Sequence, residues 1–284
     1  MSTTQIISPA RVMLRLELAD ALRSRWALFT GGVYAVVFGL FIWLGLREST
    51  VLGFTGLSRV ILNVSNAVVL AVPLVALVAT SQTVVRARHS GFFELMLTQP
   101  VRRSDWFYGA VLSRLVVVIG PLVALLLLAW TAGLAAGRGD AALVSVLLRS
   151  LAVTVSLAWA FLGVGFYIST VARTAERATV LALLAWLTAS ALHDFALIGV
   201  LLKWKLPPMT VFGLAAANPV EAARIAILGA IDPELSVLGP VGFWLANTLG
   251  PRGAVAVGVL WPLALGTLAL HRAERRLSGS DLVG

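Results

Sequence analysis

Six long apolar runs, each bordered by an arginine, constrain the fold of this chain more than any other feature. Only the pair His193–Asp194 interrupts one of them. A helix needs about 20 apolar residues to cross roughly 30 Å of hydrocarbon, and a backbone in lipid must satisfy its own hydrogen bonds. We therefore predict an all-α integral membrane protein with six transmembrane helices. The runs cover residues 26–46, 60–85, 115–137, 150–172, 178–202 and 253–271.

The composition excludes a soluble domain and a nucleic-acid-binding protein. The chain has 59% hydrophobic and 12% charged residues, whereas a soluble domain typically has about 25% charged residues. The arginines behind the net charge of +9 are spread between the apolar runs and form no basic patch, so we expect no nucleic-acid partner. The absence of cysteine excludes a disulfide framework and a thiolate metal site. We interpret residues 1–284 as a single transmembrane domain, with no secretory signal peptide at its start.

The distribution of Lys and Arg predicts the orientation of the bundle. Cytoplasmic loops of membrane proteins carry an excess of these residues. Most of the 22 Lys and Arg residues lie on the sides that hold the two termini and the polar stretch at residues 86–106. We therefore expect a multi-pass protein with both termini in the cytoplasm.

Residues 1–25 are expected to form a cytoplasmic helix that lies on the membrane surface. Leu14, Leu18 and Ala21 share one face at helical spacing. Arg11 and Arg15 border this face, from which their long side chains can reach lipid headgroups. Such a helix would make membrane lipid a partner; an ordinary solvated helix is the alternative.

The polar stretch at residues 86–106 is long for a turn between two membrane helices, and it contains an apolar segment. Gly91 permits a break before this segment, and Pro100 ends the short helix predicted there. Apolar side chains in a cytoplasmic loop are costly unless something covers them. We predict a coupling helix that docks on a soluble partner; a loop folded back onto the membrane surface is the alternative. The candidate docking residues are Gly91, Phe92, Phe93, Glu94, Leu95, Leu97, Thr98, Pro100 and Arg102.

Residues 203–252 alternate short apolar pieces with Pro-containing breaks. These pieces are too short to cross a membrane, which favours a re-entrant hairpin on the outer face before the last span. Asn218 is a typical N-cap with Pro219 at the first helical position. Glu221 and Arg224 are three residues apart and can pair on the helix that follows.

The sequence contains no motif of a catalytic or nucleotide-binding site. It has no G-x-x-x-x-G-K-[ST] loop, no H-E-x-x-H and no nucleophile elbow. The pair His193–Asp194 is interpreted as a hydrated helix end near the outer surface, rather than an intramembrane active site. The mid-membrane carboxylates and broken helices of an ion-driven carrier are not evident either. We therefore expect no enzyme activity and an energy source outside this chain.

Residues 86–103 resemble the coupling loop of type-2 ABC transporter permeases, in which Gly, Glu, a Leu-rich turn, Thr, Pro and Arg recur in this order. The N-terminal helix, the six spans and the outer hairpin also resemble that family, so the resemblance covers nearly the whole chain. Within the family, the chain is most similar to permeases that serve maturation of nitrous oxide reductase. The matching stretches are residues 16–26, 53–56, 86–103 and 218–225.

The resemblance implies a permease subunit of the bacterial inner membrane that pairs with a second copy of itself. Two ATPase subunits would grip the coupling loops and would hold the ATP and Mg²⁺. It further implies that Asn218, Pro219, Glu221 and Arg224 contact a partner on the outer face, which is a periplasmic β-helix protein in the nitrous-oxide-reductase case. No row of soft copper ligands is visible through the spans, so we expect this chain to bind no metal or cofactor. Two alternatives stay open: an ABC permease that exports a lipid, peptide or drug, and a stand-alone secondary carrier.

Overall fold

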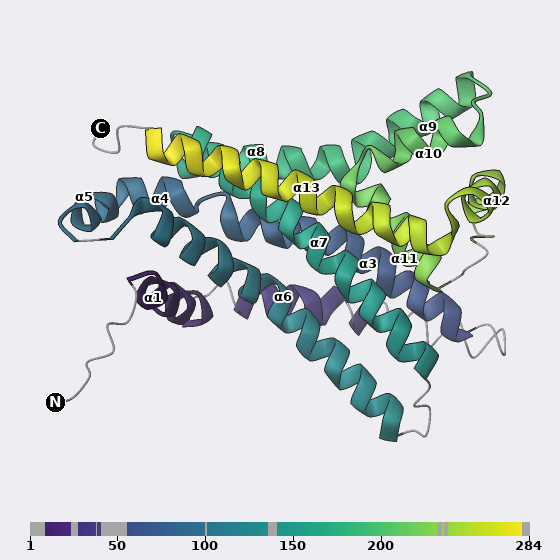
Figure 1. The fold of residues 1–284 in the computed structure, drawn as a ribbon, viewed down its shortest axis with the longest axis horizontal. Coiled ribbons are helices and arrows are strands. Elements are labelled where there is room, and N and C mark those ends of the chain that lie inside the picture. Colours follow the sequence, from purple (N-terminus) through teal and green to yellow (C-terminus); the bar gives the residue numbers. More distant parts are fainter. Residues whose placement is uncertain are drawn as a thin grey trace.

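Long helices that lie side by side make up the molecule in this computed structural model (Figure 1). The structure describes residues 9–23, 28–37, 39–40, 56–99, 101–135, 141–231, 235 and 238–279. Its longest helices are α3 (Gly56–Thr80), α6 (Arg103–Ala135), α7 (Ala141–Val171) and α13 (Gly250–Gly279). The others are α1 (Pro9–Arg23), α4 (Thr83–His89), α5 (Phe92–Leu97), α8 (Ala175–Leu187), the π-helix η2 (Thr188–Leu192), α9 (His193–Lys203), α10 (Pro208–Ala216), α11 (Pro219–Ile231) and α12 (Gly239–Thr248).

Five of the described helices are long and apolar enough to cross a membrane, and the bent pair α10–α11 would make six. The prediction of an all-α, multi-pass membrane protein is therefore confirmed. The predicted first span at 26–46 is described only over the helix Leu28–Val37 and residues 39–40, so most of it lies outside the described residues. The five helices are Ala67–His89, Arg103–Ala124, Leu148–Val171, Ala175–Lys203 and Gly250–Gly279.

The third predicted span starts earlier than the apolar run indicated. Helix α6 begins at Arg103 rather than near residue 115. Its first turn is closed by Asp105, whose carboxylate accepts a hydrogen bond from the Arg102 N–H at 3.4 Å. A carboxylate in the first turn also interacts favourably with the helix dipole. Arg114 therefore lies within a continuous helix and not at its beginning.

The second predicted span is interrupted, because α3 ends at Thr80 and α4 starts at Thr83. The residue before α4, Gln82, makes no side-chain cap for it. Instead, the Ser169 hydroxyl of α7 accepts hydrogen bonds from the N–H groups of Val84 and Val85, at 2.9 and 3.2 Å. These N–H groups have no partner inside their own helix, so a side chain from another span caps α4.

Close helix crossings hold the centre of the bundle together. An added Cβ at Gly266 of α13 would lie 2.5 Å from the carbonyl oxygen of Trp159 in α7. At Gly258, also in α13, an added Cβ would lie 2.7 Å from the carbonyl oxygen of Ala222 in α11. Small residues permit such close approach of backbones in membranes, where helices associate by packing. The buried ridge of α13 consists of Ala254, Gly258, Pro262, Gly266, Leu270, Ala273 and Leu277.

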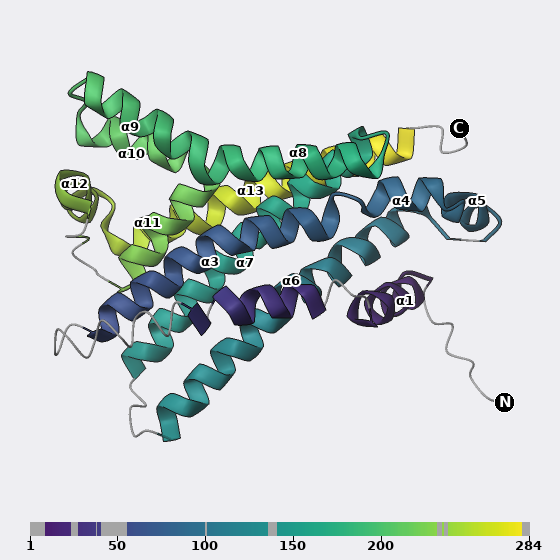
Figure 2. The same ribbon diagram turned by 180° about the vertical axis from the view of Figure 1, so that it is seen from behind.

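The continuous helix α8–η2–α9 runs along the edge of this bundle (Figure 2). Only 11% of the residues in its most apolar stretch are buried. None of the side chains from Thr188 to Lys203, all of which the structure describes, is fully buried. We call Ala175–Lys203 the peripheral helix.

The two ends of the bundle carry different elements (Figures 1 and 2). Helix α5 lies at one end, beside α1 and the last turns of α13. Helix α12 and the connection between α9 and α10 lie at the other end. We refer to these as the α5 end and the α12 end.

Candidate functional site

The predicted coupling segment forms a short helix that projects at the α5 end (Figure 1). Gly91 has φ 71°, in the left-handed region that favours glycine, and reverses the chain between α4 and α5. Its carbonyl accepts hydrogen bonds from the N–H groups of Glu94 and Leu95, at 3.1 and 3.2 Å. The predicted break at Gly91 is therefore confirmed.

The apolar side chains of α5 are divided between two faces. Phe93 is only 1% exposed, and Met96 is also buried. The Phe93 ring meets the Trp106 ring edge-on, with 5.0 Å between ring centres. The expectation that the apolar side chains of this segment face a soluble partner is thus corrected for Phe93 and Met96, which pack on their own chain, whereas Leu95 is 70% exposed beside the exposed Glu94.

The remaining residues of the predicted docking set surround α5. Phe92 is half-buried, and its ring lies 5.6 Å from that of Trp106. Thr98 is exposed, and its hydroxyl donates to the Leu95 carbonyl at 2.7 Å. Arg102 is also exposed. The side chain of Leu97 and the whole of Pro100 lie outside the described residues.

The supports of α5 extend to the last span. The Arg103 guanidinium donates to the carbonyls of Leu277 and Ser278, both at 3.4 Å. The Tyr108 hydroxyl donates to a Glu274 carboxylate oxygen at 2.6 Å. The start of α6, which carries Trp106, is therefore tied to the end of α13. Sequence reasoning missed these contacts, because no local pattern relates residues so far apart in the chain.

Helix α1 contacts the same region through one polar bond. The indole N–H of Trp106 donates to the Glu17 carboxylate at 2.8 Å. Burial raises the pKa of Glu17 above its usual range, although the Trp106 hydrogen bond and the charge of Arg114 oppose the shift. Helix α1 therefore packs against α6 next to the support of α5.

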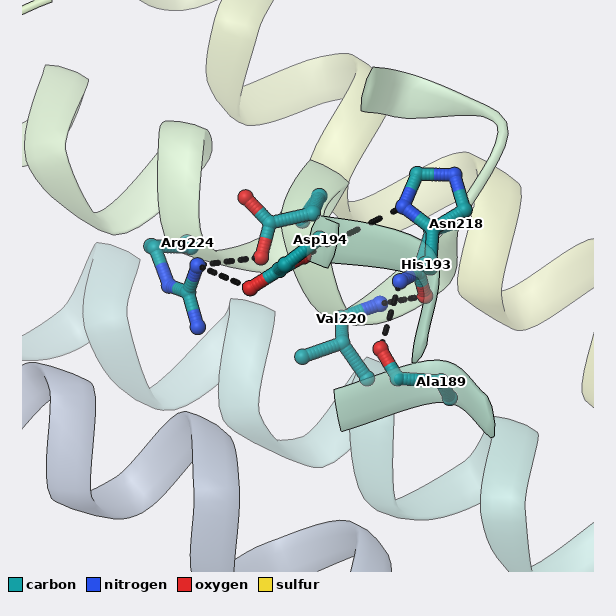
Figure 3. A network of polar contacts seen from close by, with 7 residues as sticks. Ala189, His193, Asp194, Asn218, Val220 and Arg224 are labelled. Atoms are coloured by element: carbon teal, nitrogen blue, oxygen red, sulfur yellow. Dashed lines mark hydrogen bonds and ion pairs between the residues drawn. The ribbon is translucent and has the colours of Figure 1, made fainter. Parts of the chain in front are cut away.

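Helices α10 and α11 lie where the hairpin was predicted; the chain bends by 117° between them, and we call this pair the hairpin. Asn218 lies between them and is 5% exposed. Its side-chain oxygen accepts a hydrogen bond from the Val220 N–H at 3.0 Å, and α11 begins at Pro219. The prediction of an N-cap with proline at the first helical position is confirmed. The side-chain N–H of Asn218 also donates to the Ala189 carbonyl of η2 at 2.6 Å (Figure 3).

An ion-pair cluster lies beside this cap, as Figure 3 shows. The Arg224 guanidinium pairs with Glu221 on the same helix, as predicted, and with Asp194 of α9 at 3.2 Å. His193 Nδ1 lies 3.9 Å from the other Asp194 oxygen. We call Asp194, Glu221 and Arg224 the hairpin cluster.

The position of Asp194 differs from the expected hydrated helix end. Its side chain is 29% exposed and is paired with a cation from another helix. The hairpin causes this difference, because α11 brings Arg224 back against the peripheral helix. The one sequence signal was a carboxylate inside an otherwise charge-free run, since ionisable groups within spans are costly and mark functional positions.

The described residues contain no cluster of His, Cys, Asp or Glu that could hold a metal ion. The hairpin cluster makes an ion pair between α9 and α11. At the α5 end, Glu94 and Leu95 are exposed on a helix whose Phe93 ring packs against Trp106.

Comparisons with known proteins agree on one family. The model of the family described as ABC-2 family transporter protein matches residues 11–241. Similar proteins include the probable ABC transporter permease protein NosY of Stutzerimonas stutzeri, 28% identical over 263 residues, which cover 87% of this chain and 89% of the relative. The protein of the same name from Pseudomonas aeruginosa is 28% identical over 262 residues, or 86% of this chain and 94% of the relative.

Proposed function

The chain belongs to the ABC-2 family and is a permease subunit of an ABC transporter, and from this premise we propose that it couples ATP hydrolysis by a separate ATPase subunit to work at the outer face. The α5 surface carries this proposal. Glu94 and Leu95 are exposed on a helix at one end of the bundle. The contact between the rings of Phe93 and Trp106 packs that helix against α6. Movement of a docked ATPase would therefore act on α6 directly.

The chain itself supplies the membrane part and the docking surface in this proposal. Two copies pair in the bacterial inner membrane, with the α5 end and both termini in the cytoplasm and α1 on the membrane surface. Each copy docks one ATPase subunit, which binds the ATP and Mg²⁺. The α12 end then faces the periplasm, and the hairpin that carries Asn218, Pro219, Glu221 and Arg224 leads to that end.

The finer function that we propose is maturation of nitrous oxide reductase. Its support is the similarity to two permeases named NosY along nearly their full length. A periplasmic β-helix protein is the proposed partner at the outer face. Since the chain has no cysteine, we propose that it moves no copper along thiolate ligands and does conformational work instead. Metal analysis of the purified complex should find no stoichiometric copper on the permease, and a full equivalent per chain would refute this.

Variants of the exposed α5 residues test the docking proposal. Glu94→Ala and Leu95→Ala should each reduce recovery of the ATPase with the tagged permease from membranes, and Asp20→Ala, at an exposed carboxylate of α1, should not. Membrane insertion should be unchanged in all three. Recovery of the ATPase at the wild-type ratio and activity with both α5 variants would show that α5 does not dock it.

A further inference from the structure

The hairpin α10–α11 and the peripheral helix meet at a short stretch where the helix leaves α geometry. Residues Thr188–Leu192 form a π-helix within a span that is otherwise α-helical. Such π-bulges are rare and concentrate at functional sites. The cap residue of α11, Asn218, donates a hydrogen bond to the carbonyl of Ala189, the second residue of this stretch. Asp194, in the first turn of α9, binds Arg224 of α11.

The two helices differ in how firmly they are held. Helix α11 belongs to the tight centre of the bundle, where its residues Ala222, Ala223 and Ala226 are buried and Gly258 of α13 touches it. From Thr188 onward, the peripheral helix has no fully buried side chain. Because this half of the helix has no fully buried apolar side chain, its polar contacts help to fix its position.

The polar contacts of the peripheral helix follow its length. Near the α5 end, the Gln82 side chain donates to Thr179 at 2.5 Å. Two residues before the π-helix, the Trp186 indole donates to the Leu70 carbonyl of α3 at 3.1 Å. The next two contacts, at Ala189 and Asp194, both come from the hairpin. The hairpin thus holds the half of the peripheral helix that leads to the α12 end.

The depth of these contacts raises their strength. At about 1.5 Å per residue, Asp194 lies roughly 28 Å from the start of the peripheral helix and about 14 Å from its end. An ion pair at such a position is weakly screened by water and salt. A buried side chain with an interhelical hydrogen bond, such as Asn218, adds a directional constraint.

We propose that Asn218, Asp194 and Arg224 form a polar joint that fixes the peripheral helix to the outer hairpin, so that the two move together during transport. The inference rests on the proposed function for the source of the movement, but the joint itself does not depend on an ATPase. The three residues are positioning residues, because they orient two helices and need not contact a substrate.

The hairpin cluster allows the ion pair between the two helices to be removed without leaving Arg224 unpaired. Two carboxylates face one guanidinium. Asp194→Ala leaves Arg224 paired with Glu221, so folding should be preserved while the bond to α9 is lost. Exchange of the charges, as Asp194→Arg with Arg224→Asp, should restore the ion pair between α9 and α11. Glu176→Gln, at an exposed carboxylate of α8, is the matched control.

Spin labels can measure the joint directly, because the chain contains no cysteine. Labels at Ile198→Cys on α9 and Leu260→Cys on α13 occupy exposed positions. Labelled permease, diluted with unlabelled chain, should give one narrow distance. Asp194→Ala should at least double the width of the distribution, as should Asn218→Ser, which keeps a capping hydroxyl. The charge exchange and Glu176→Gln should remain narrow.

The same labels in the complete complex with its ATPase test the transmission. ATP with vanadate should shift the wild-type distance, and Asp194→Ala should abolish the shift while ATP hydrolysis continues. If Asp194→Ala shows a distance distribution as narrow as that of the wild type and the same shift with ATP and vanadate, the proposed joint is refuted. A broader distance distribution in Asp194→Ala, together with no ATP-dependent change of distance in the wild-type complex, would support the joint and refute the proposed function.

Discussion

Gly266→Ala tests whether α7 and α13 are as close as the structure places them. The new Cβ would lie 2.5 Å from the Trp159 carbonyl oxygen and 2.6 Å from Cδ1 of its ring, where an ordinary contact begins at 3.4 Å. The oxygen belongs to the backbone and cannot rotate away. The two helices must therefore separate by roughly 1 Å, which forfeits between about a quarter and a half of the dispersion energy of each contact at the crossing.

The expected magnitude follows from three contributions. Overpacking of a tight interface typically costs about 1–3 kcal/mol. The Trp159 indole donates to the Thr267 hydroxyl at 3.1 Å beside the crossing, and an interhelical bond of this kind in a membrane contributes about 0.6 kcal/mol. Alanine is favoured over glycine within a helix by about 0.5–1 kcal/mol. The net loss of unfolding free energy should therefore be about 1–3 kcal/mol.

Thermal unfolding of the purified permease in detergent is the assay, with Gly120→Ala as the control. Gly120 lies within α6, and an added Cβ there would meet nothing within 4 Å. The Tm of Gly266→Ala should fall by several degrees, whereas that of Gly120→Ala should be unchanged or slightly higher. Equal Tm values for the two variants would refute the close crossing.

Three further variants address the α5 end. Phe93→Ala should lower stability by about 3–5 kcal/mol and reduce ATPase recovery as well, because the side chain supports α5; Phe93→Leu should retain most of both, and a Tm of Phe93→Ala equal to wild type would contradict the burial. Burial raises the pKa of Glu17 in the folded protein. The contribution of Glu17 to the free energy of unfolding is therefore greatest at a pH below the usual pKa of a carboxylic acid, and it is lost as the pH rises through the raised pKa. Glu17→Gln keeps the bond from Trp106, and its Tm should rise relative to wild type between pH 4 and pH 7; a constant difference would contradict the shift. Ser169→Ala should cost about 1–3 kcal/mol because it leaves two buried N–H groups unpaired, more than Ser113→Ala, whose hydroxyl binds only within its own helix.

The architecture was predictable where one physical requirement dominates. A backbone in lipid has to be helical, so charge-free runs identified the spans from α3 onward. Local chemistry was equally readable: the cap at Asn218, the pair Glu221–Arg224 and the turn at Gly91 each depend on residues within a few positions.

Contacts between distant segments were not predictable. Phe93 and Leu95 are both apolar and two residues apart, and only the position of Trp106 decides which one is buried. Asp194 and Arg224 are 30 residues apart, and they meet because the hairpin bends between them. The interruption of the second span at Ser81 carries no Pro or Gly, and the hydroxyl that caps the helix after it comes from another span.

That hydroxyl makes α4 mechanically dependent on α7. An interruption of a helix such as the one between Thr80 and Thr83 would normally act as a hinge and allow the segment beyond it to rotate independently. Here the first turn of α4 is anchored to Ser169, so a torque applied at α5 has to turn a neighbouring span as well. Since α7 in turn lies close to the backbone of α13, a displacement of α4 would act on both α7 and α13.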